Sequence, residues 1–420
     1  MAALTTYACR IMPDSTDDRQ SIERHGRATA LLAAARRVQP EATAFLTALV
    51  EIETPSDVPE SQAAALDLIA GATGDLGMSC RRFRGRRSGG TLIARAPAAP
   101  STPLQLLVGH CDTVWDRGTL ATMPVRREGT RLYGPGVFDM KAGLTQMLFA
   151  LRLLRELNFE PSVRPVILVN SDEEIGTLDT HATLRRLAGI ANRVFVLEPS
   201  LAPDGRLKTA RKGVAQYRVT VHGRAAHAGL NPEDGVSAID ELARLVPQLH
   251  ALNDESAGVN VNVGTIEGGS RPNVVAPTCT ALVDVRVPTH ADGVRVADAF
   301  GALQLRNDEA RIEVELTEGR PPMEFTPGGR RLWEMASEIA GAMEFELGHG
   351  RAGGGSDGNI TSEFAPTLDG LGAVGDGAHS AHENVDLEYM PERTALLAAL
   401  LLEPALGASD LATTSAVADH

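Results

Sequence analysis

Apolar and polar positions alternate along this chain in two different ways. Between residue 40 and about residue 210, short apolar runs alternate with stretches of helical spacing, which is typical of a layered βαβ sheet. Three of the runs, at 104–109, 166–169 and 194–197, have no helical period and predict buried strands. We therefore expect an α/β unit with a mostly parallel sheet.

A second pattern follows between residues 212 and 321. It predicts strands at 216–222, 259–266, 281–287 and 312–317, and helices at 235–252 and 291–305. This order, βαββαβ, is that of a ferredoxin-like domain. After Pro321-Pro322 the first pattern resumes, with helices near 332–343 and 391–402. The second unit is thus predicted to be an insertion into the first.

These changes of pattern divide the chain into five parts. Residues 1–38 are expected to be a mobile or helical extension, and residues 403–420, rich in Ala, Ser and Thr, a disordered tail. Residues 39–211 and 322–402 are expected to form the two parts of the α/β unit, and residues 212–321 the insertion. A chain of 420 residues exceeds what one hydrophobic core usually holds, which agrees with two domains.

The first buried run ends in side chains suited to a metal site. Because strand side chains alternate between faces, His110 and Asp112 share one face while Cys111 points to the other. A histidine that binds a metal needs its second ring nitrogen held by an acceptor, and Asp112 is positioned to supply one. Cys111 is therefore interpreted as a buried structural thiol rather than a zinc ligand.

Carboxylates follow the other two runs. Asp172-Glu173-Glu174 comes after the second, Glu198 comes after the third, and Asp139 lies in a glycine-punctuated stretch just before a helical pattern. Unpaired acids at the edge of a core resist burial, and a metal cluster removes that problem. In open α/β sheets, sites form at the carboxyl ends of the strands, where the strand-borne members of this set fall. The pattern predicts a metal centre there.

Five motifs in order resemble those of the dinuclear zinc metallopeptidases, the family that includes glutamate carboxypeptidase, aminoacylase and succinyl-diaminopimelate desuccinylase. The resemblance extends from about Pro40 to about Leu402 and is greatest to the glutamate carboxypeptidases. Each motif is weak alone, but five in the family's order are specific. The motifs are His110-Cys111-Asp112, Gly136 to Gly143, Asp172-Glu173-Glu174, Leu197-Glu198-Pro199 and Gly377-Ala378-His379-Ser380-Ala381-His382-Glu383.

The resemblance implies two zinc ions per chain, for which cobalt can substitute. It implies that Asp139 bridges the ions, that His110 and Glu198 complete one zinc site, that Glu174 and His379 complete the other, and that Glu173 is the general base. Composition alone allows His379 or His382 as the last ligand. The family pattern of a histidine, then serine, then glutamate fits His379 with Ser380 and Glu383.

Two residues outside this cluster also resemble family positions. His227, flanked by small residues in the insertion, matches the histidine that donates to the reacting carbonyl from a neighbouring subunit, although a lone histidine is more often structural. Gly355 lies in the glycine-rich stretch 351–359, which lacks the lysine and hydroxyl pair of a phosphate-binding loop. That stretch is expected to line the substrate pocket.

Asn273, Arg286 and Arg320 resemble the family's substrate-binding positions. Arginine offers a planar fork that suits a carboxylate, and Arg320 resembles an arginine that binds the carboxylate of the substrate. Arg286 could equally be a strand residue paired with Asp284. Arg211 and Lys212 are weaker candidates and could be surface charges only.

Composition narrows the class of protein. A net charge of −14 argues against nucleic-acid binding and weakly against anionic substrates, so local cations would have to attract them. We find no apolar run long enough to cross a bilayer and no signal-like start, and therefore expect a cytoplasmic protein without membrane contact. The four cysteines indicate no disulfide framework.

These observations predict a zinc-dependent hydrolase that cleaves an amide bond of a small N-acyl or peptidyl amino acid. Release of a C-terminal amino acid is the leading hypothesis, with glutamate favoured by the resemblance. The alternative is an N-acyl-amino-acid amidohydrolase or a dipeptidase with the same metals. A non-catalytic binding protein is less favoured because Glu173 and every ligand are present. Relatives form dimers through the ferredoxin-like domain, so a homodimer is expected.

Overall fold

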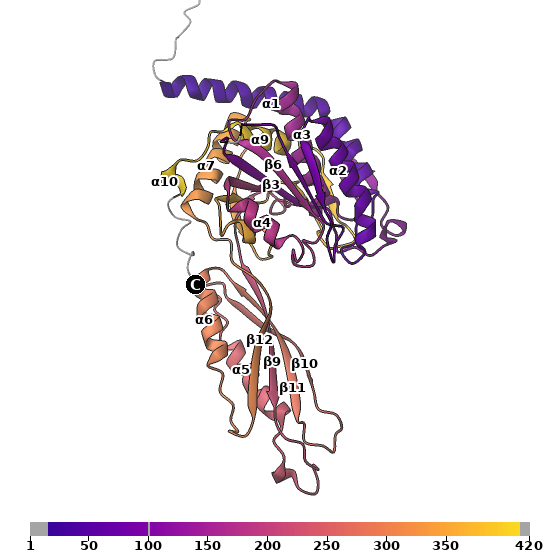
Figure 1. Ribbon diagram of the computed structural model, residues 1–420, viewed down its shortest axis with the longest axis vertical. Coiled ribbons are helices and arrows are strands. Elements are labelled where there is room, and N and C mark those ends of the chain that lie inside the picture. The colour runs from indigo at the N-terminus through magenta and orange to yellow at the C-terminus, as the bar shows by residue number, and fades with distance from the viewer. Residues whose placement is uncertain (1–15, 100, 412–420) are drawn as a thin grey trace, which may run out of the picture.

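The structure, a computed structural model, describes residues 16–99 and 101–411, so residues 1–15 of the predicted extension and 412–420 of the predicted tail lie outside it. The chain forms two units arranged end to end, an α/β unit and a ferredoxin-like unit (Figure 1). The fold class predicted from the sequence is confirmed.

A six-stranded sheet forms the centre of the α/β unit. Its order is β1-β2-β6-β3-β7-β14. Strands β6, β3, β7 and β14 run parallel, whereas β1 and β2 are antiparallel to their neighbours. The bounds are β1 Ser79–Phe83, β2 Thr91–Arg95, β3 Leu104–His110, β6 Arg164–Asn170, β7 Ala191–Val196 and β14 Thr367–Leu368.

Helices cover both faces of this sheet because its strand residues are apolar on both sides. Leu107 and Phe195 pack under one helical layer, and Leu106 and Val196 pack under the other. The first layer contains α1 Thr16–Val50, α2 Ala63–Asp75, α3 Ala142–Glu156, α7 Pro327–Ala342 and α9 Met390–Leu402. The second contains α4 His181–Ala188 and α8 Asp357–Thr361.

Two small sheets complete the α/β unit. β8 pairs with β13 in parallel, and a four-stranded antiparallel sheet has the order β15-β16-β5-β4. Their bounds are β8 Leu207–Arg211, β13 His349–Ala352, β4 Arg126–Glu128, β5 Arg131–Tyr133, β15 Gly375–Asp376 and β16 Asn384–Asp386. A short helix, α10 Ala408–Leu411, ends the described chain.

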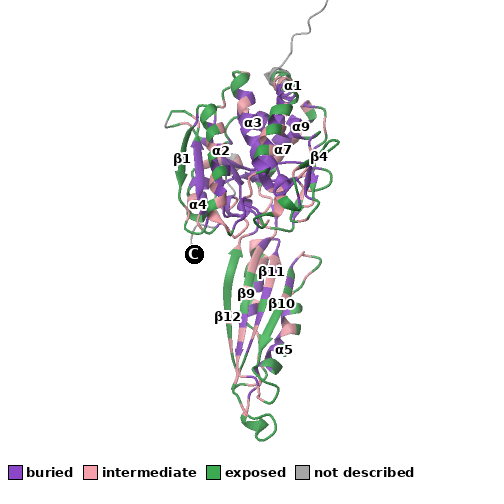
Figure 2. Cartoon of the chain, turned by 90° about the vertical axis from the view of Figure 1, so that its right-hand side faces the viewer, coloured by how far each residue is buried: buried purple, intermediate pink, exposed green. Residues whose placement is uncertain are grey.

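The inserted unit has the predicted βαββαβ order. Its antiparallel sheet is ordered β10-β11-β9-β12, with two helices packed on one face. Its other face is largely exposed, as the strands in Figure 2 show. The elements are β9 Gly213–His222, α5 Ala238–His250, β10 Asn260–Gly268, β11 Thr278–Val287, α6 His290–Gly301 and β12 Arg311–Arg320.

The described part of the expected extension is helical, one of its two expected forms, and both it and the described part of the tail pack on the α/β unit. Helix α1 continues through residue 38, and Leu31 on one side of that position and Leu46 on the other are fully buried in the same core. At the other end, Leu406 is also buried. Arg193, fully buried, donates to the carbonyls of Glu403 and Pro404 at 2.7 Å each. Residues 403–411 are therefore packed against the α/β unit, contrary to the expected disorder.

The inserted unit is joined to the α/β unit at a narrow hinge. Arg211 and Met323 exchange two backbone hydrogen bonds there, of 2.9 and 3.1 Å. A side-chain bridge crosses the hinge next to them. The His290 ring, at the start of α6, lies 2.8 Å from a Glu324 oxygen and 2.9 Å from a Glu363 oxygen of the α/β unit.

Candidate active site

The parallel strands deliver most of the predicted metal ligands to one edge of the central sheet. His110 is the last residue of β3, Glu173 and Glu174 follow the end of β6, and Glu198 follows β7. Because parallel strands end at the same edge, these side chains meet there. Cys111, one residue beyond His110, packs instead in the apolar core, where burial raises the pKa of its thiol to about 12.

Two loops supply the remaining members of the cluster. Asp139 lies between β5 and α3 in the irregular turn Val137–Lys141. His379 lies between β15 and β16, with a positive φ of 60°. Gly143, in the first turn of α3, allows this helix to approach the end of β7, since a Cβ there would lie 1.9 Å from the Leu197 carbonyl oxygen.

Asp139 lies between two groups of ligand-type atoms. Its Oδ1 is 3.2 Å from His110 Nε2, which is also 3.4 Å from a Glu198 oxygen. Its Oδ2 is 3.6 Å from His379 Nε2, which is also 3.5 Å from a Glu174 oxygen. One carboxylate thus offers one oxygen to each of two groups that contain histidine and glutamate. Nitrogen and carboxylate oxygen ligands of this kind suit zinc.

Holding these buried, charged side chains close together costs free energy unless a cation binds between them. Glu174 Oε1 is buried and accepts no hydrogen bond among the described residues, since its contact with His379 Nε2 is 3.5 Å long. Burial opposes protonation of His110, but Asp112, Asp139 and Glu198 outweigh it and raise the pKa of this histidine well above its usual value. A metal ion would satisfy the same carboxylates in place of that proton, so the residues present fit a metal centre.

Asp112 connects the His110 ring to the loop that carries the two glutamates. His110 Nδ1 lies 3.0 Å from the Asp112 backbone oxygen and 3.4 Å from its carboxylate. The same carboxylate, fully buried, accepts from the backbone N–H of Glu174 at 3.1 Å and of Glu173 at 3.3 Å, and from the Ser56 hydroxyl at 2.8 Å. Asp112 therefore orients three members of the cluster at once.

Glu383 has a similar supporting position under Asp139. One of its oxygens accepts from the backbone N–H of Phe138 and Asp139 at 2.9 and 3.0 Å, and the other from Gly136 at 2.9 Å. Trp115 Nε1 donates to it at 2.7 Å. The motif that contains Glu383 was recognised in the sequence, but these contacts were not foreseen, because they join residues more than 240 positions apart.

Glu173, the predicted general base, is buried beside Arg320. Burial raises the pKa of Glu173 to about 8, although the Arg320 guanidinium opposes that shift. Arg320 donates to the Glu173 carboxylate at 2.5 Å and to its backbone oxygen at 2.7 Å. A carboxyl group with a pKa near neutrality is suited to accept a proton and return it.

Three charged residues around Glu198 were missed or misjudged from the sequence. Arg211, interpreted there as a possible surface charge, is buried and donates to Glu198 at 3.1 Å and to Asp369 at 2.7 Å. Lys208 Nζ lies 3.8 Å from Glu198, and burial lowers its pKa. No local pattern could reveal this network, because Asp369 is 158 residues from Arg211.

The other predicted substrate residues are divided between the two units. Gly355 lies beside the cluster, where its carbonyl accepts from Arg211 at 3.3 Å. Arg286 pairs with Asp284 at 2.8 Å, the alternative considered from the sequence.

His382, the other histidine that composition allowed as the last ligand, lies 2.9 Å from the Ser380 hydroxyl and is exposed.

His227 and Asn273 lie together at the far end of the inserted unit. The N–H of Ala228 donates to the Asn273 carbonyl at 3.0 Å. β9 begins at the hinge and extends for ten residues before the His227 loop, which is roughly 30 Å at the usual rise of a strand. The structure therefore does not bring His227 or Asn273 to the cluster of the same chain.

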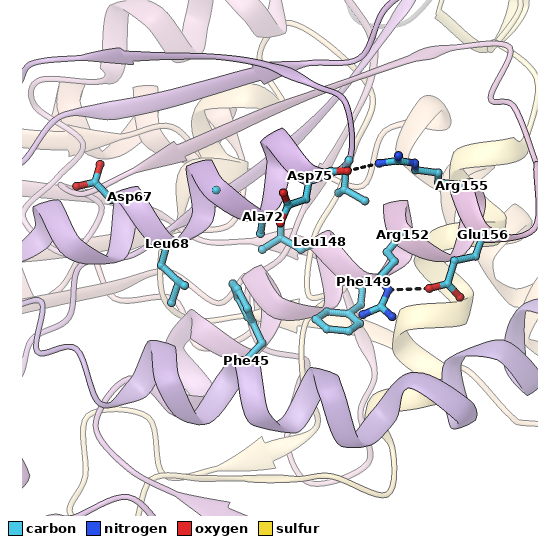
Figure 3. Close-up of a pocket in the computed structure, with 12 residues that line it drawn as sticks. Phe45, Asp67, Leu68, Ala72, Asp75, Leu148, Phe149, Arg152, Arg155 and Glu156 are labelled. Carbon is cyan, nitrogen blue, oxygen red and sulfur yellow. Dashed lines mark hydrogen bonds and ion pairs between the residues drawn. The ribbon is translucent and has the colours of Figure 1, made fainter.

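A separate hollow of about 800 Å³ lies between α1, α2 and α3 (Figure 3). Phe45, Leu148 and Phe149 line it together with several charged residues. Arg152 already pairs with Glu156 at 2.7 Å. This hollow contains no histidine and none of the predicted catalytic residues, so the cluster at the sheet edge remains the candidate active site.

The fold and the cluster together define a metal-dependent hydrolase with an inserted antiparallel unit. The chain matches the model of the Peptidase family M20/M25/M40 over residues 106–403, and it belongs to this family. No helix among the described residues is both long enough and apolar enough to span a membrane.

Individual relatives have several activities in their names. The chain is 31% identical over 391 residues to carboxypeptidase G2 of Pseudomonas sp. (strain RS-16), covering 91% of this chain and 93% of that protein. It is 28% identical over 370 residues to the succinyl-diaminopimelate desuccinylase of Paracidovorax citrulli (strain AAC00-1), covering 80% and 90%. The crystal structure of aminopeptidase PepT from Bacillus cereus ATCC 10987 matches with a TM-score of 0.72 at 22% identity, covering 86% and 98%, and shares the fold.

Proposed function

We propose that this chain is a zinc-dependent hydrolase that cleaves an amide bond and releases a C-terminal amino acid, with glutamate favoured. The observation that carries the proposal is the Asp139 carboxylate, which offers one oxygen to a His110–Glu198 group and the other to a His379–Glu174 group. The relative carboxypeptidase G2 supports the choice of reaction.

Two zinc ions per chain would be held by five residues, and cobalt could substitute. Asp139 would bridge them, with His110 and Glu198 on one ion and Glu174 and His379 on the other. The ions would supply Lewis acidity, which polarises the substrate carbonyl and lowers the pKa of water. The buried Glu174 Oε1 supports this assignment, because its contact with His379 Nε2 is 3.5 Å long and a poorly satisfied buried acceptor is costly unless a cation binds it.

Glu173 would carry the proton during the reaction. It would take a proton from the attacking water and return it to the leaving amine, as a general base and then a general acid. Arg320 would hold Glu173 in position. Its guanidinium N–H groups that do not bond Glu173 would donate to the carboxylate of the substrate. Arg286 and Gly355 would line the rest of the pocket.

His227 and Asn273 would reach the active site from a second subunit. The exposed face of the inserted sheet supports a dimer, since Leu282, which projects from that face beside Arg218, is 43% exposed. The His227 ring accepts through Nδ1 from the N–H groups of Gly229 and Leu230, both at 3.1 Å. Its neutral form would therefore carry the proton on Nε2, free to donate to the oxyanion.

Two matched substitutions test the base and the ligand separately. Glu173→Gln removes the proton acceptor and leaves every proposed ligand, so turnover should collapse while zinc content stays near two per chain. Glu174→Gln should instead lower the zinc content itself. Elemental analysis and hydrolysis of N-acyl and peptidyl amino acids are measured on both. Near-normal turnover by Glu173→Gln, or full activity after exhaustive chelation, would refute the proposal.

A substrate panel with varied C-terminal and acyl parts decides between the proposed carboxypeptidase and its alternative. Preference for a C-terminal glutamate supports the first. Indifference to that residue with strict choice of the acyl group would identify an N-acyl-amino-acid amidohydrolase, the reading favoured by the desuccinylase relatives.

Mixed dimers test the role of His227. Glu173→Gln and His227→Ala are each expected to be inactive, but a mixed dimer contains one site with its own Glu173 and the partner's intact histidine. Co-expression should therefore restore activity, up to about half of one dimer's capacity. Mixed dimers as inactive as either parent would show that His227 does not act across subunits.

A further inference from the structure

An arginine-rich segment lies at one edge of the central sheet in an otherwise acidic protein. Five of the seven residues from Arg81 to Arg87 are arginine, whereas the chain as a whole has a net charge of −14. We call this segment the basic edge. It begins on β1, whose five residues are all exposed, as Figure 2 shows at the margin of the α/β unit.

Most of the positive charge of the basic edge is free to bind a ligand. Arg82 pairs with Asp67 of α2. Among the residues that the structure describes, no acidic side chain forms an ion pair with the other four, Arg81, Arg84, Arg86 and Arg87, and all four are exposed. Arg84 and Arg86 also line a hollow of about 530 Å³ between this segment and the 3₁₀ helix Pro59–Gln62, to which Glu60 contributes the one acidic side chain.

The loop after β1 is held rigidly next to the candidate active site. The Asp179 carboxylate accepts from the backbone N–H groups of Arg86 and Arg87 at 2.7 Å each, and of Ser88 at 3.1 Å. The Asp179 N–H in turn donates to Asp172 at 2.6 Å, one residue before the proposed base. The basic edge is therefore attached to the same loop that presents Glu173 and Glu174.

The register of the strands gives the separation from the cluster. Phe83 pairs with Thr91, and Leu92 pairs with Val169, so β1 ends at the same edge of the sheet as His110. Three strand spacings separate β1 from β3, which is about 14 Å. An extended peptide covers this distance in about four to five residues.

From this arrangement we infer that the basic edge binds the acidic upstream part of a peptide substrate whose C-terminal residue lies at the metal cluster. The inference rests on the proposed function and names its substrate class, an acidic peptide of about five or more residues. β1 is the outermost strand of its sheet, so its outer backbone groups suit an extended peptide. The overall negative charge of the protein disfavours a long nucleic acid as the ligand. The alternative explanation of the arginines is that they only protect an edge strand from pairing with other chains.

The test compares two substitution sets with the same change of charge. One is Arg81→Gln, Arg84→Gln and Arg86→Gln; the control is Arg36→Gln, Arg244→Gln and Arg295→Gln on exposed helix positions of α1, α5 and α6. Three substrates share the same C-terminal residue. Two are hexapeptides, one with aspartates and one with serines upstream of that residue, and the third is the corresponding dipeptide. For the unaltered enzyme, kcat/KM for the acidic hexapeptide should exceed that for the neutral one by about tenfold, through electrostatic attraction.

The first set should abolish this ratio, and the control should keep it. Raising the salt to about 0.5 M should reduce the ratio in the unaltered enzyme, because exposed charges are screened. An unchanged ratio in the first set overturns the inference, as does a ratio near one in the unaltered enzyme. Hydrolysis of the dipeptide reports on the proposed function independently, since a dipeptide cannot reach the basic edge.

A binding measurement keeps the two proposals separable without turnover. Fluorescence anisotropy of a labelled acidic hexapeptide is measured on Glu173→Gln with and without the first substitution set. Loss of binding by about tenfold with that set supports the inference. Arginine-dependent binding of a single-stranded oligonucleotide but not of the peptide would identify nucleic acid as the ligand and overturn it.

Discussion

Arg193 is the largest fully buried side chain of the protein's described part, and its replacement gives a quantitative test of how the C-terminal segment is held. Its guanidinium donates twice to the Gln105 side-chain oxygen, at 2.8 and 2.9 Å, and to the Glu403 and Pro404 carbonyls at 2.7 Å. Burial lowers the pKa of Arg193 to about 10, so the charge is held at a cost.

Arg193→Met keeps the volume of the stem and removes every donor. The Gln105 and Glu403 oxygens then remain buried without a partner, at about 1–3 kcal/mol each. The guanidinium no longer has to be desolvated, which offsets part of that cost. We expect the free energy of unfolding of the α/β unit to fall by about 3 kcal/mol as the balance of these effects.

Urea unfolding followed by tryptophan fluorescence measures this change, because both tryptophans, Trp115 and Trp333, lie in the α/β unit. With a slope of about 3 kcal/mol per molar urea, the midpoint should shift by about 1 M at fixed protein concentration. The control Arg186→Met, on the exposed side of α4, should change stability by less than about 0.5 kcal/mol. Equal midpoints for the two variants would refute the reasoning.

Three further predictions concern the cluster, the helix packing and the hinge. Asp112→Ala should weaken zinc binding by about 10–100-fold in chelator competition, because it removes the carboxylate that lies beside the His110 ring and accepts from the backbone N–H groups of Glu173 and Glu174; unchanged affinity would contradict this. Gly143→Ala should lower the thermal midpoint, at a cost of about 2 kcal/mol or more, because its Cβ would meet the Leu197 oxygen; an unaltered melting curve would contradict the packing. The ion pairs of His290 with Glu363 and Glu324 raise its pKa from 6.5 to about 9, so its stabilisation is complete below pH 6.5 and is lost as the pH rises through 9. His290→Gln should therefore flatten the decline of stability over that range, and an unchanged slope would show that the bridge does not form.

The sequence predicted those features that depend on short stretches of chain. His110, Glu173, Glu174 and Glu198 were predicted because each lies at or shortly after the end of a buried apolar run, and the runs became β3, β6 and β7. The inserted unit was found for the same reason, since alternation and helical spacing identify its six elements locally.

Features that depend on distant partners were not predicted. Arg211 resembled a surface charge because Glu198 and Asp369 surround it only in the folded chain. Helix α1 resembled an extension because the helix that buries much of its apolar side, α9, lies about 350 residues later in the sequence. The order of residues 403–411 was not predicted because their anchor, Arg193, belongs to a strand of the sheet.

The narrow hinge has a consequence for how the protein is synthesised. Arg211 and Met323 are hydrogen-bonded neighbours, yet the 111 residues between them are all made before the last part of the α/β unit. At translation rates of about 5–20 residues per second, α7 and α9 are synthesised on the order of ten seconds or more after α1 and α3. During that interval the apolar surface of α1, including Leu46 and Leu49, has no cover from α9, whereas the inserted unit has all its own elements by the time α7 is made. The nascent α/β unit is therefore the stage at which a chaperone or a misfolding event would act on this chain.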